Sequence, residues 1–159
     1  MVLSQQSSVL QLVPFIIEEQ QYALPLAIVE RVLPMVAVSP LPQAPCIALG
    51  VINLHGRVIP VLDIRRRLGL PARGYGLTTY LLVARTSRRT CALPVDEVWG
   101  VRQVAAAAVV PADAVLPHLG HVAGIVVLAD GLLVIQDLEA FLSLEEEQQL
   151  VEALKGTET

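Results

Sequence analysis

Few side chains in this sequence have the types and spacing that catalysis or metal binding requires. His118 and His121 lie three residues apart, a spacing that can place two imidazoles on one face of a helix as metal ligands. Pro117 and Gly120 disfavour that helix, and no third ligand stands nearby in the sequence. A metal-dependent enzyme that uses His118 and His121 is therefore only an outside alternative.

The other reactive groups have structural interpretations. Cys91 lies within an apolar run, which favours a small core residue over a nucleophile. Asp63 and Asp137 end two similar apolar segments, where capping of the strand end explains them better than catalysis does. The sequence contains no glycine-rich phosphate loop, no paired-carboxylate motif and no nucleophile elbow. We therefore predict a binding module that is not an enzyme and uses no cofactor and no metal.

Composition indicates a folded protein of a reducing compartment. The 159 residues are 54% apolar and 16% charged, which excludes disorder. The two cysteines, Cys46 and Cys91, have no metal-type spacing and do not suggest a disulfide scaffold. Apolar stretches are all shorter than the span of about 20 residues that crosses a membrane, and the first residues lack the charged start of a signal peptide. We expect a cytoplasmic protein without direct membrane insertion.

Charge is divided unevenly along the chain. Residues 1–102 contain ten arginines and six acidic residues, whereas residues 103–159 contain one lysine and nine acidic residues. The arginines concentrate in residues 65–67 and 85–89. Nucleic-acid binding favours stacking aromatics beside such patches, but aromatic residues are only 4% of this chain. We expect no nucleic-acid partner and place these arginines in solvated turns or salt bridges.

Short apolar runs separated by glycine and proline predict mainly β structure. In residues 50–63, GVINLHGRVIPVLD, two apolar runs flank His55-Gly56, and a glycine there permits the positive φ that a two-residue hairpin turn requires. Near the C-terminus, Ser143 and Glu146 have the spacing of a capping box and predict a short helix that extends to Lys155.

Two pairs of segments indicate an internal repeat. Residues 50–63 match residues 124–137, which read GIVVLADGLLVIQD, at an offset of 74. Residues 22–32, YALPLAIVERV, match residues 91–101, CALPVDEVWGV, at an offset of 69. The pairs occur in the same order, so the repeat predicts two similar small β lobes that pack together and leave a groove between them.

Residues 50–63, followed by a basic stretch that ends in Leu-Gly-Leu, resemble the signature hairpin of CheW, the coupling protein of bacterial chemotaxis. Residues 22–32, the proline-rich residues 40–45 and the segment Val95-Asp96-Glu97-Val98 fit CheW-like domains in order and spacing. The resemblance extends over about residues 15–142.

The resemblance implies a mainly β fold of two packed five-stranded barrels of the Src-homology-3 type, with a short C-terminal helix. We expect one CheW-like domain at residues 14–155 after a flexible N-terminus at residues 1–13. Its lobes would comprise about residues 22–83 and 84–142, with crossing terminal segments.

As a function, the resemblance implies a non-catalytic adaptor. Such a protein couples the cytoplasmic tip of chemoreceptors to the regulatory domain of a CheA-type histidine kinase, and it works in the cytoplasm in association with membrane receptor arrays. An alternative within the same family is a scaffold for a different kinase output, such as twitching motility.

The resemblance also implies a partner-binding surface. Carried over position by position, its residues are Val29, Glu30, Gly50, Asn53, His55, Gly56, Arg57 and Val98. The family typically has arginine where this sequence has His55. Arginine is permanently charged and offers a planar fork of donors, whereas histidine is shorter and mostly neutral near pH 7. His55 is therefore expected to alter docking to the receptor.

Overall fold

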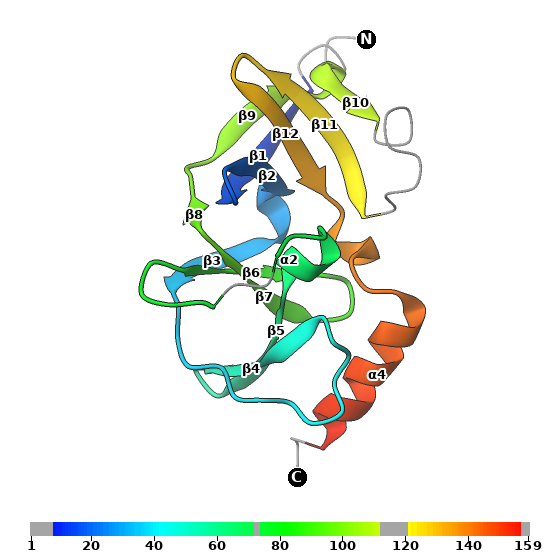
Figure 1. Cartoon of the computed structure of the whole chain (residues 1–159). Helices are drawn as coiled ribbons and strands as arrows, with labels where there is room; N and C mark the ends of the chain where they lie inside the picture. Colours follow the sequence, from blue (N-terminus) through cyan, green and yellow to red (C-terminus); the bar gives the residue numbers. More distant parts are fainter. Residues whose placement is uncertain (1–7, 72–73, 112–120, 157–159) are drawn as a thin grey trace.

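Two β-sheets form almost all of the protein, as expected from the short apolar runs (Figure 1). The computed structural model describes residues 8–71, 74–111 and 121–156. The seven-stranded sheet, at the top of Figure 1, contains β1 (Val9–Ile17), β2 (Gln20–Pro25), β8 (Glu97–Val98), β9 (Arg102–Ala105), β10 (Val109–Pro111), β11 (Val122–Leu128) and β12 (Gly131–Gln136). The five-stranded sheet contains β3 (Val29–Pro34), β4 (Ala48–Leu54), β5 (Arg57–Leu62), β6 (Tyr80–Arg85) and β7 (Thr90–Val95).

Helical segments are few and mostly short. Those of the described residues are η1 (Leu26–Ile28), α2 (Ile64–Arg67), η2 (Ala106–Ala108), η3 (Leu138–Ala140) and the longer C-terminal helix α4 (Leu144–Lys155). None of the helices within the described ranges has the length and apolar character needed to cross a membrane.

Each sheet has its two edges joined by a continuous stretch of chain. In the seven-stranded sheet the order is β10-β11-β12-β2-β1, and both β8 and β9 pair with β1. The chain runs from β9 through η2 directly into β10, so it links one edge to the other. In the five-stranded sheet, of order β3-β6-β7-β5-β4, a bridge between Ser39 and Val51 of β4 similarly links the chain after β3 to the opposite edge. Both sheets therefore curve back on themselves.

The internal repeat is present in the backbone pairing. Phe15 pairs with Tyr22 in β1–β2, and the residues 69 positions later, Ala84 and Cys91, pair in β6–β7. The hairpins β4–β5 and β11–β12 likewise share one register at an offset of 74, since Val51 pairs with Pro60 and Ile125 with Val134. Each hairpin also has an irregularity at the same place, before Gly50 and before Gly124.

The two halves of the repeat exchange strands. Hairpin β4–β5 of the first half joins β6 and β7 of the second half, and Val61 of β5 pairs in parallel with Ala92. Hairpin β11–β12 of the second half joins β1 and β2 of the first half, and Ile135 pairs in parallel with Ala23. Each sheet is therefore built from both halves of the sequence.

This exchange differs from the expected lobes. A boundary between residues 83 and 84 falls inside β6, because β6 and β7 belong to the same sheet as β3–β5. The expected flexible N-terminus is also wrong from Val9 onward, since β1 begins there and pairs with β9. Residues 1–7 of that expectation lie outside the described residues. The composition of this N-terminal segment did not predict a strand. The segment is ordered because it pairs with strands that lie far along the sequence.

The largest core cluster lies between the two sheets. One face of β1 and β2 contributes Phe15, Ile17 and Leu24, and one face of β6 and β7 contributes Leu82 and Leu93. The opposite faces of these strands fill two smaller cores, one inside each sheet. The seam between the lobes is thus packed with apolar side chains, and burying them stabilises the sheets against each other.

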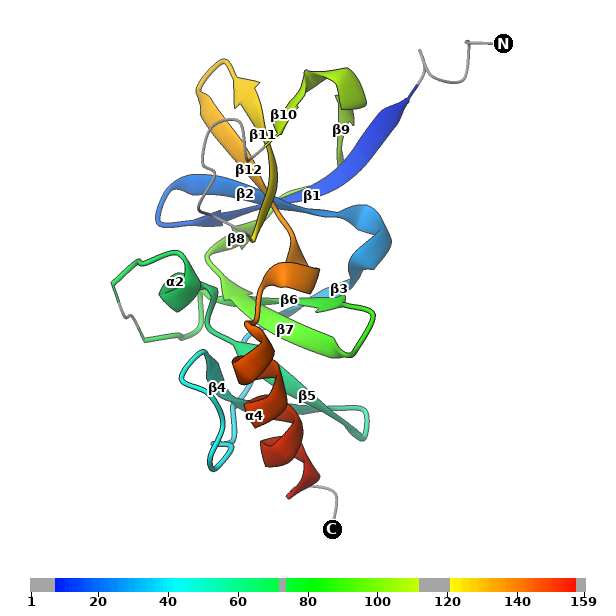
Figure 2. The same cartoon turned by 90° about the vertical axis from the view of Figure 1, so that its right-hand side faces the viewer.

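Helix α4 runs alongside the five-stranded sheet (Figure 2). Its predicted capping box is confirmed, because the Ser143 hydroxyl accepts from the Glu146 backbone and the Glu146 carboxylate accepts from the Ser143 backbone. Leu150 and Ala153 are buried against the main core. The helix therefore closes the lobe as part of its hydrophobic core.

Acidic residues of α4 pair with arginines from the two basic stretches. Arg67 of α2 forms an ion pair with Glu146, and Arg89 of the β6–β7 turn forms one with Glu147. Burial tends to raise the pKa of Glu146, but hydrogen bonds from Arg67 and Ser143 outweigh it and lower this pKa below its ordinary value. The uneven charge of the sequence is thus partly neutralised within the fold, by the salt bridges that we expected for these arginines.

Candidate partner-binding site

The tip of hairpin β4–β5 has a two-residue turn at His55-Gly56, as predicted. Both residues have positive φ, 52° and 84° respectively, the combination of a type I′ turn. The Asn53 carboxamide oxygen accepts a hydrogen bond of 2.8 Å from the Gly56 backbone and closes the turn. Histidine tolerates positive φ better than most side chains, so the turn holds the exposed imidazole at the tip.

A polar network ties this hairpin to two neighbouring strands. The Arg57 guanidinium lies 3.5 Å from a carboxylate oxygen of Glu30 on β3 and donates a 2.9 Å hydrogen bond to the hydroxyl of Thr90 on β7. That hydroxyl in turn donates to the other oxygen of Glu30, at 3.2 Å. Three strands therefore contribute to one cluster, in which Thr90 fixes the orientation of the ion pair.

His55 faces a cation. A guanidinium nitrogen of Arg31 lies 3.5 Å from His55 Nε2, a contact that is a hydrogen bond only when this nitrogen is unprotonated. Glu30, the residue before Arg31 on β3, pairs with Arg57. At this tip His55 therefore contacts a cation, and the nearby carboxylate of Glu30 is engaged by Arg57.

The structure brings together five of the eight proposed residues, namely Glu30, Asn53, His55, Gly56 and Arg57. Val29 is half-buried next to Glu30, where it pairs with Ala84. Gly50 is buried on β4, and a Cβ added there would lie 2.2 Å from the Ser39 carbonyl oxygen, so this glycine allows two backbones to approach closely. Gly50 therefore supports the hairpin from within.

Val98 belongs to the other sheet. It lies on β8, pairs with Phe15 and packs, half-buried, against the core between the sheets. Its counterpart at the repeat offset of 69 is Val29, which pairs with Ala84 at the matching position. These two valines thus occupy equivalent places in the two halves of the repeat.

Thr90 was not predicted from the sequence as part of this cluster. It is separated from Arg57 by 33 residues and from Glu30 by 60. A threonine that begins a strand is an ordinary feature, so the sequence carried no signal for this contact. Only the position of β7 beside β5 brings its hydroxyl to the ion pair.

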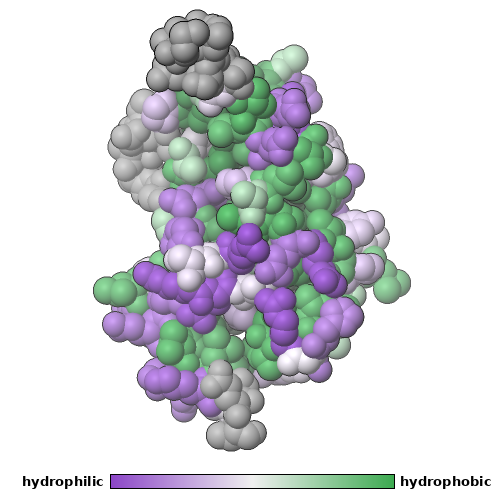
Figure 3. All heavy atoms as spheres, turned by 180° about the vertical axis from the view of Figure 1, so that it is seen from behind, coloured by the Kyte–Doolittle hydropathy of each residue, from purple (hydrophilic) through white to green (hydrophobic). Residues whose placement is uncertain are grey.

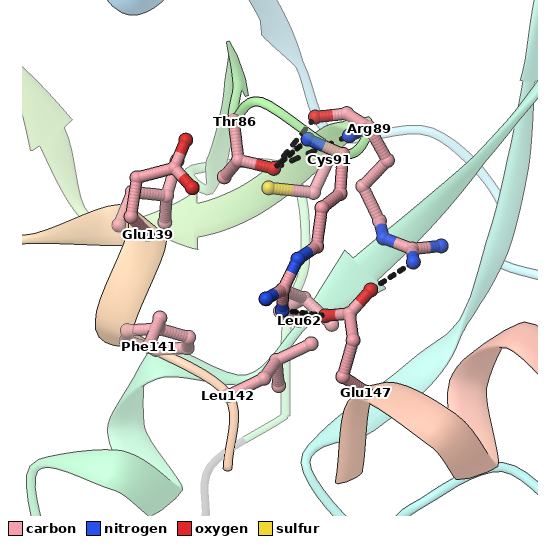
Figure 4. A pocket seen from close by; sticks show the side chains of 10 residues that line it. Leu62, Thr86, Arg89, Cys91, Glu139, Phe141, Leu142 and Glu147 are labelled. Atoms are coloured by element: carbon pink, nitrogen blue, oxygen red, sulfur yellow. Dashed lines mark hydrogen bonds and ion pairs between the residues drawn. The ribbon is translucent and has the colours of Figure 1, made fainter. Parts of the chain in front are cut away.

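A second candidate, a small pocket between β7, η3 and α4, is lined by Leu62, Thr86, Arg88, Arg89, Cys91, Leu138, Glu139, Phe141, Leu142 and Glu147 (Figure 4). Its volume is about 20 Å³, room for about one water molecule. Burial raises the pKa of Cys91 to about 12, so its thiol stays protonated at neutral pH. The interpretation of Cys91 as a core residue is confirmed, and the pocket is a packing defect under α4.

Asp63 and Asp137 cap the segments that follow the two hairpins. The Asp63 carboxylate accepts from the Arg65 backbone and the Asp137 carboxylate from the Glu139 backbone, each at 3.1 Å. Tyr75 also donates a 2.7 Å hydrogen bond to Asp63. Burial, and then this hydrogen bond, raise the pKa of the Tyr75 phenol. The sequence predicted that these aspartates cap the strand ends; the structure shows them at those ends as N-caps of α2 and η3.

Of the two histidines considered for metal binding, only His121 falls in the described part of the chain. It is buried at the edge of the Phe141 ring, and its Nδ1 lies 3.2 Å from the Gln136 carboxamide oxygen. His118 lies outside the described residues. Across the described ranges, no three histidine, cysteine, aspartate or glutamate side chains are grouped so that they could hold a metal ion.

Two curved sheets that share a core, with a polar hairpin at one end, define a β-rich fold of two lobes. The model of the CheW-like domain family matches residues 11–146, and the chain therefore belongs to this family. Among solved structures, the scaffolding protein CheW of Thermoanaerobacter tengcongensis superposes with a TM-score of 0.79 at 26% identity, covering 87% of this chain and 96% of that one.

Curated relatives agree with this assignment. The chemotaxis protein CheW of Rhizobium meliloti is 33% identical over 88 residues, 55% of this chain and 57% of that protein. The probable chemotaxis protein CheW of Rhizobium etli is 26% identical over 140 residues, 87% of this chain and 90% of that protein. The match thus spans a little over half of the first relative and most of the second.

Proposed function

We propose that this protein is a non-catalytic adaptor that couples chemoreceptors to a CheA-type histidine kinase. The observation that carries the proposal is the match of the CheW-like family model to residues 11–146, together with the superposition on a CheW scaffolding protein. On this view the protein acts in the cytoplasm at membrane receptor arrays, and its partners are the receptor tip and the regulatory domain of the kinase.

We assign receptor binding to the β4–β5 hairpin and the strands beside it. The exposed tip and the network of Glu30, Arg57 and Thr90 support this assignment, because an ordered polar cluster offers a partner a fixed set of donors and acceptors. Val29 and Val98 would add half-buried apolar contacts, one from each sheet. Gly50 would serve by keeping the hairpin in place.

The test is reconstitution with purified partners. The protein is mixed with a soluble chemoreceptor cytoplasmic fragment and a CheA-type kinase, and complex formation and kinase autophosphorylation are measured. We expect a ternary complex in which the receptor fragment changes the phosphorylation rate only when this protein is present. Binding to neither partner would overturn the proposal.

A site variant locates the receptor contact. Arg57→Glu reverses the charge of the hairpin cation and removes its contacts with Glu30 and Thr90, so it should weaken receptor binding by about tenfold. Glu152→Lys reverses an exposed charge on α4 and is the matched control, expected to bind within about twofold of the unsubstituted protein. Equal receptor binding by both variants would show that the receptor does not bind at the hairpin.

A further inference from the structure

One end of the five-stranded sheet gathers charged side chains from four elements. Strands β3 and β7 begin there, β6 ends there, and the β4–β5 hairpin turns there. In Figure 2 the tip of this hairpin and the β6–β7 turn project toward the same side of the molecule. Figure 3 looks at that side and shows hydrophilic residues concentrated across its middle, below a more hydrophobic upper part.

The acidic groups at this end are already engaged. Both oxygens of Glu30 are occupied, one by Arg57 and the other by Thr90. Glu147 reaches the same end from α4 and faces two guanidinium groups, those of Arg89 and, at 3.8 Å, Arg88. Glu139 of η3 also reaches this end, where its carboxylate accepts from the backbone and the hydroxyl of Ser87. These three carboxylates are still outnumbered by the arginines at this end, which are Arg31, Arg57, Arg85, Arg88 and Arg89.

Two arginines at this end have no acidic partner among the residues that the structure describes. Arg31 contacts the His55 ring, and Arg85 donates a 3.3 Å hydrogen bond to the backbone carbonyl of Ala27. Neither forms an ion pair with any carboxylate of the described residues. Both are exposed, and they flank the start of β3, where Val29 pairs with Ala84. Their positive charge is thus available to a partner.

The contact between Arg31 and His55 places part of this positive charge at the hairpin. The Arg31 guanidinium lies 3.5 Å from His55 Nε2, so its positive charge is held beside the exposed hairpin tip. The charged groups that face it are Arg31 on β3 and, beyond Glu30, Arg57 on β5. A partner carboxylate placed here would find donors on two sides.

We infer that Arg31 and Arg85 are specificity-determining residues, and that the receptor segment docking at the β4–β5 hairpin carries a carboxylate that faces them. The inference rests on the proposed function and specifies the chemistry of the partner. Its basis is charge complementarity, because an uncompensated basic surface beside an ordered hairpin favours an acidic partner and disfavours a basic one.

The experiment compares charge reversals on the two sheets. Arg31→Glu and Arg85→Glu are made on the five-stranded sheet, and Arg102→Glu, at an exposed arginine of β9, is the matched control on the other sheet. Affinity for a soluble chemoreceptor cytoplasmic fragment is measured at low and high salt, and thermal unfolding checks that each variant is folded. We expect the first two variants to bind about tenfold more weakly at low salt, with a smaller difference at high salt, and the control to change by less than about twofold.

A charge swap completes the test. Acidic residues of the receptor fragment are changed one at a time to lysine, and one such change should restore binding to Arg31→Glu while it weakens binding to the unsubstituted protein. If the unsubstituted protein binds and all three reversals behave alike, the inference is overturned and the proposed function stands. If Arg31→Glu weakens binding to the kinase and leaves binding to the receptor unchanged, the partner is misassigned and the inference is overturned. Failure of the unsubstituted protein to bind any receptor fragment overturns both.

Discussion

The hairpins β4–β5 and β11–β12 have the same register but present different surfaces. In the first, Asn53 and Val58 are paired, and Asn53 closes a turn that exposes His55 beside Arg31. In the second, the paired residues at the equivalent positions are Val127 and Leu132, and both are exposed apolar side chains. Backbone pairing in the repeat is therefore common to both hairpins, whereas the charged surface is found at one of them.

The buried ends of the two hairpins provide the largest predicted effect. Gly50 and Gly124 are equivalent, but an added Cβ meets the Ser39 carbonyl oxygen at 2.2 Å in the first case and a Val109 methyl group at 2.5 Å in the second. A side chain can adjust more easily than a paired backbone. We expect Gly50→Ala to cost about 4 kcal/mol of stability and Gly124→Ala about 1–2 kcal/mol, measured by urea unfolding. Equal losses would show that the backbone at Ser39 yields as readily as a side chain.

Much of the local structure followed from the sequence. The turn at His55-Gly56, the capping box of α4 and the caps at Asp63 and Asp137 each depend on residues within a few positions of one another. The repeat was also visible, because equivalent strands retain similar apolar patterns. Such features are encoded locally, and sequence reasoning finds them for that reason.

The exchange of strands between the two halves could not be predicted from the sequence. A repeat shows which segments are similar, but it does not show which of them pair. The parallel pairing of Val61 with Ala92, for example, joins residues 31 positions apart. The cluster of Glu30, Arg57 and Thr90 depends on that pairing, so its third member was missed. Long-range pairing also explains why β1 begins at Val9, within a segment expected to be flexible.

A second prediction asks whether the apolar residues of the seven-stranded sheet share in binding. Val98 is half-buried on β8, at an edge where a charge can still reach water. We expect Val98→Asp to weaken assembly with receptor and kinase by about tenfold or more while the protein remains folded. Val127→Asp, on the exposed face of β11, is the control and should change binding by less than about twofold. Unfolding of the Val98 variant would identify this residue as part of the core.

The segments after the two hairpins differ as well, and this difference predicts a pH effect. After β5, Arg67 of α2 binds Glu146, whereas η3 after β12 contains no arginine. The pKa of Glu146 is lowered in the folded protein, so its contribution to stability is present above the unfolded pKa of about 4.3 and is lost as pH falls through the lower folded value.

We therefore expect Glu146→Gln to reduce the free energy of unfolding by about 1 kcal/mol or less near pH 7. The difference in stability between the variant and the unsubstituted protein should become smaller in acid. Thermal unfolding between pH 7 and about pH 3 measures this difference. The matched control is Glu152→Gln, which removes an exposed carboxylate of the same helix and should change stability little at any pH. A Glu146 effect that stays constant with pH would show that the ion pair with Arg67 is not its cause.

The smallest expected effect concerns the residue that most clearly distinguishes this hairpin from the family pattern. His55→Arg adds a permanent charge and a longer donor next to Arg31, so binding to a standard chemoreceptor tip should strengthen by about threefold, with kinase binding nearly unchanged. Part of the gain is offset, because arginine tolerates the positive φ at this turn less well than histidine and is repelled by the neighbouring guanidinium. Salt dependence separates these terms, since added salt weakens the new attraction but leaves the backbone cost. Equal receptor affinity for both forms at low salt would show that His55 is not part of the recognition surface. Arg31 would then be the cation of this pair that contacts a partner.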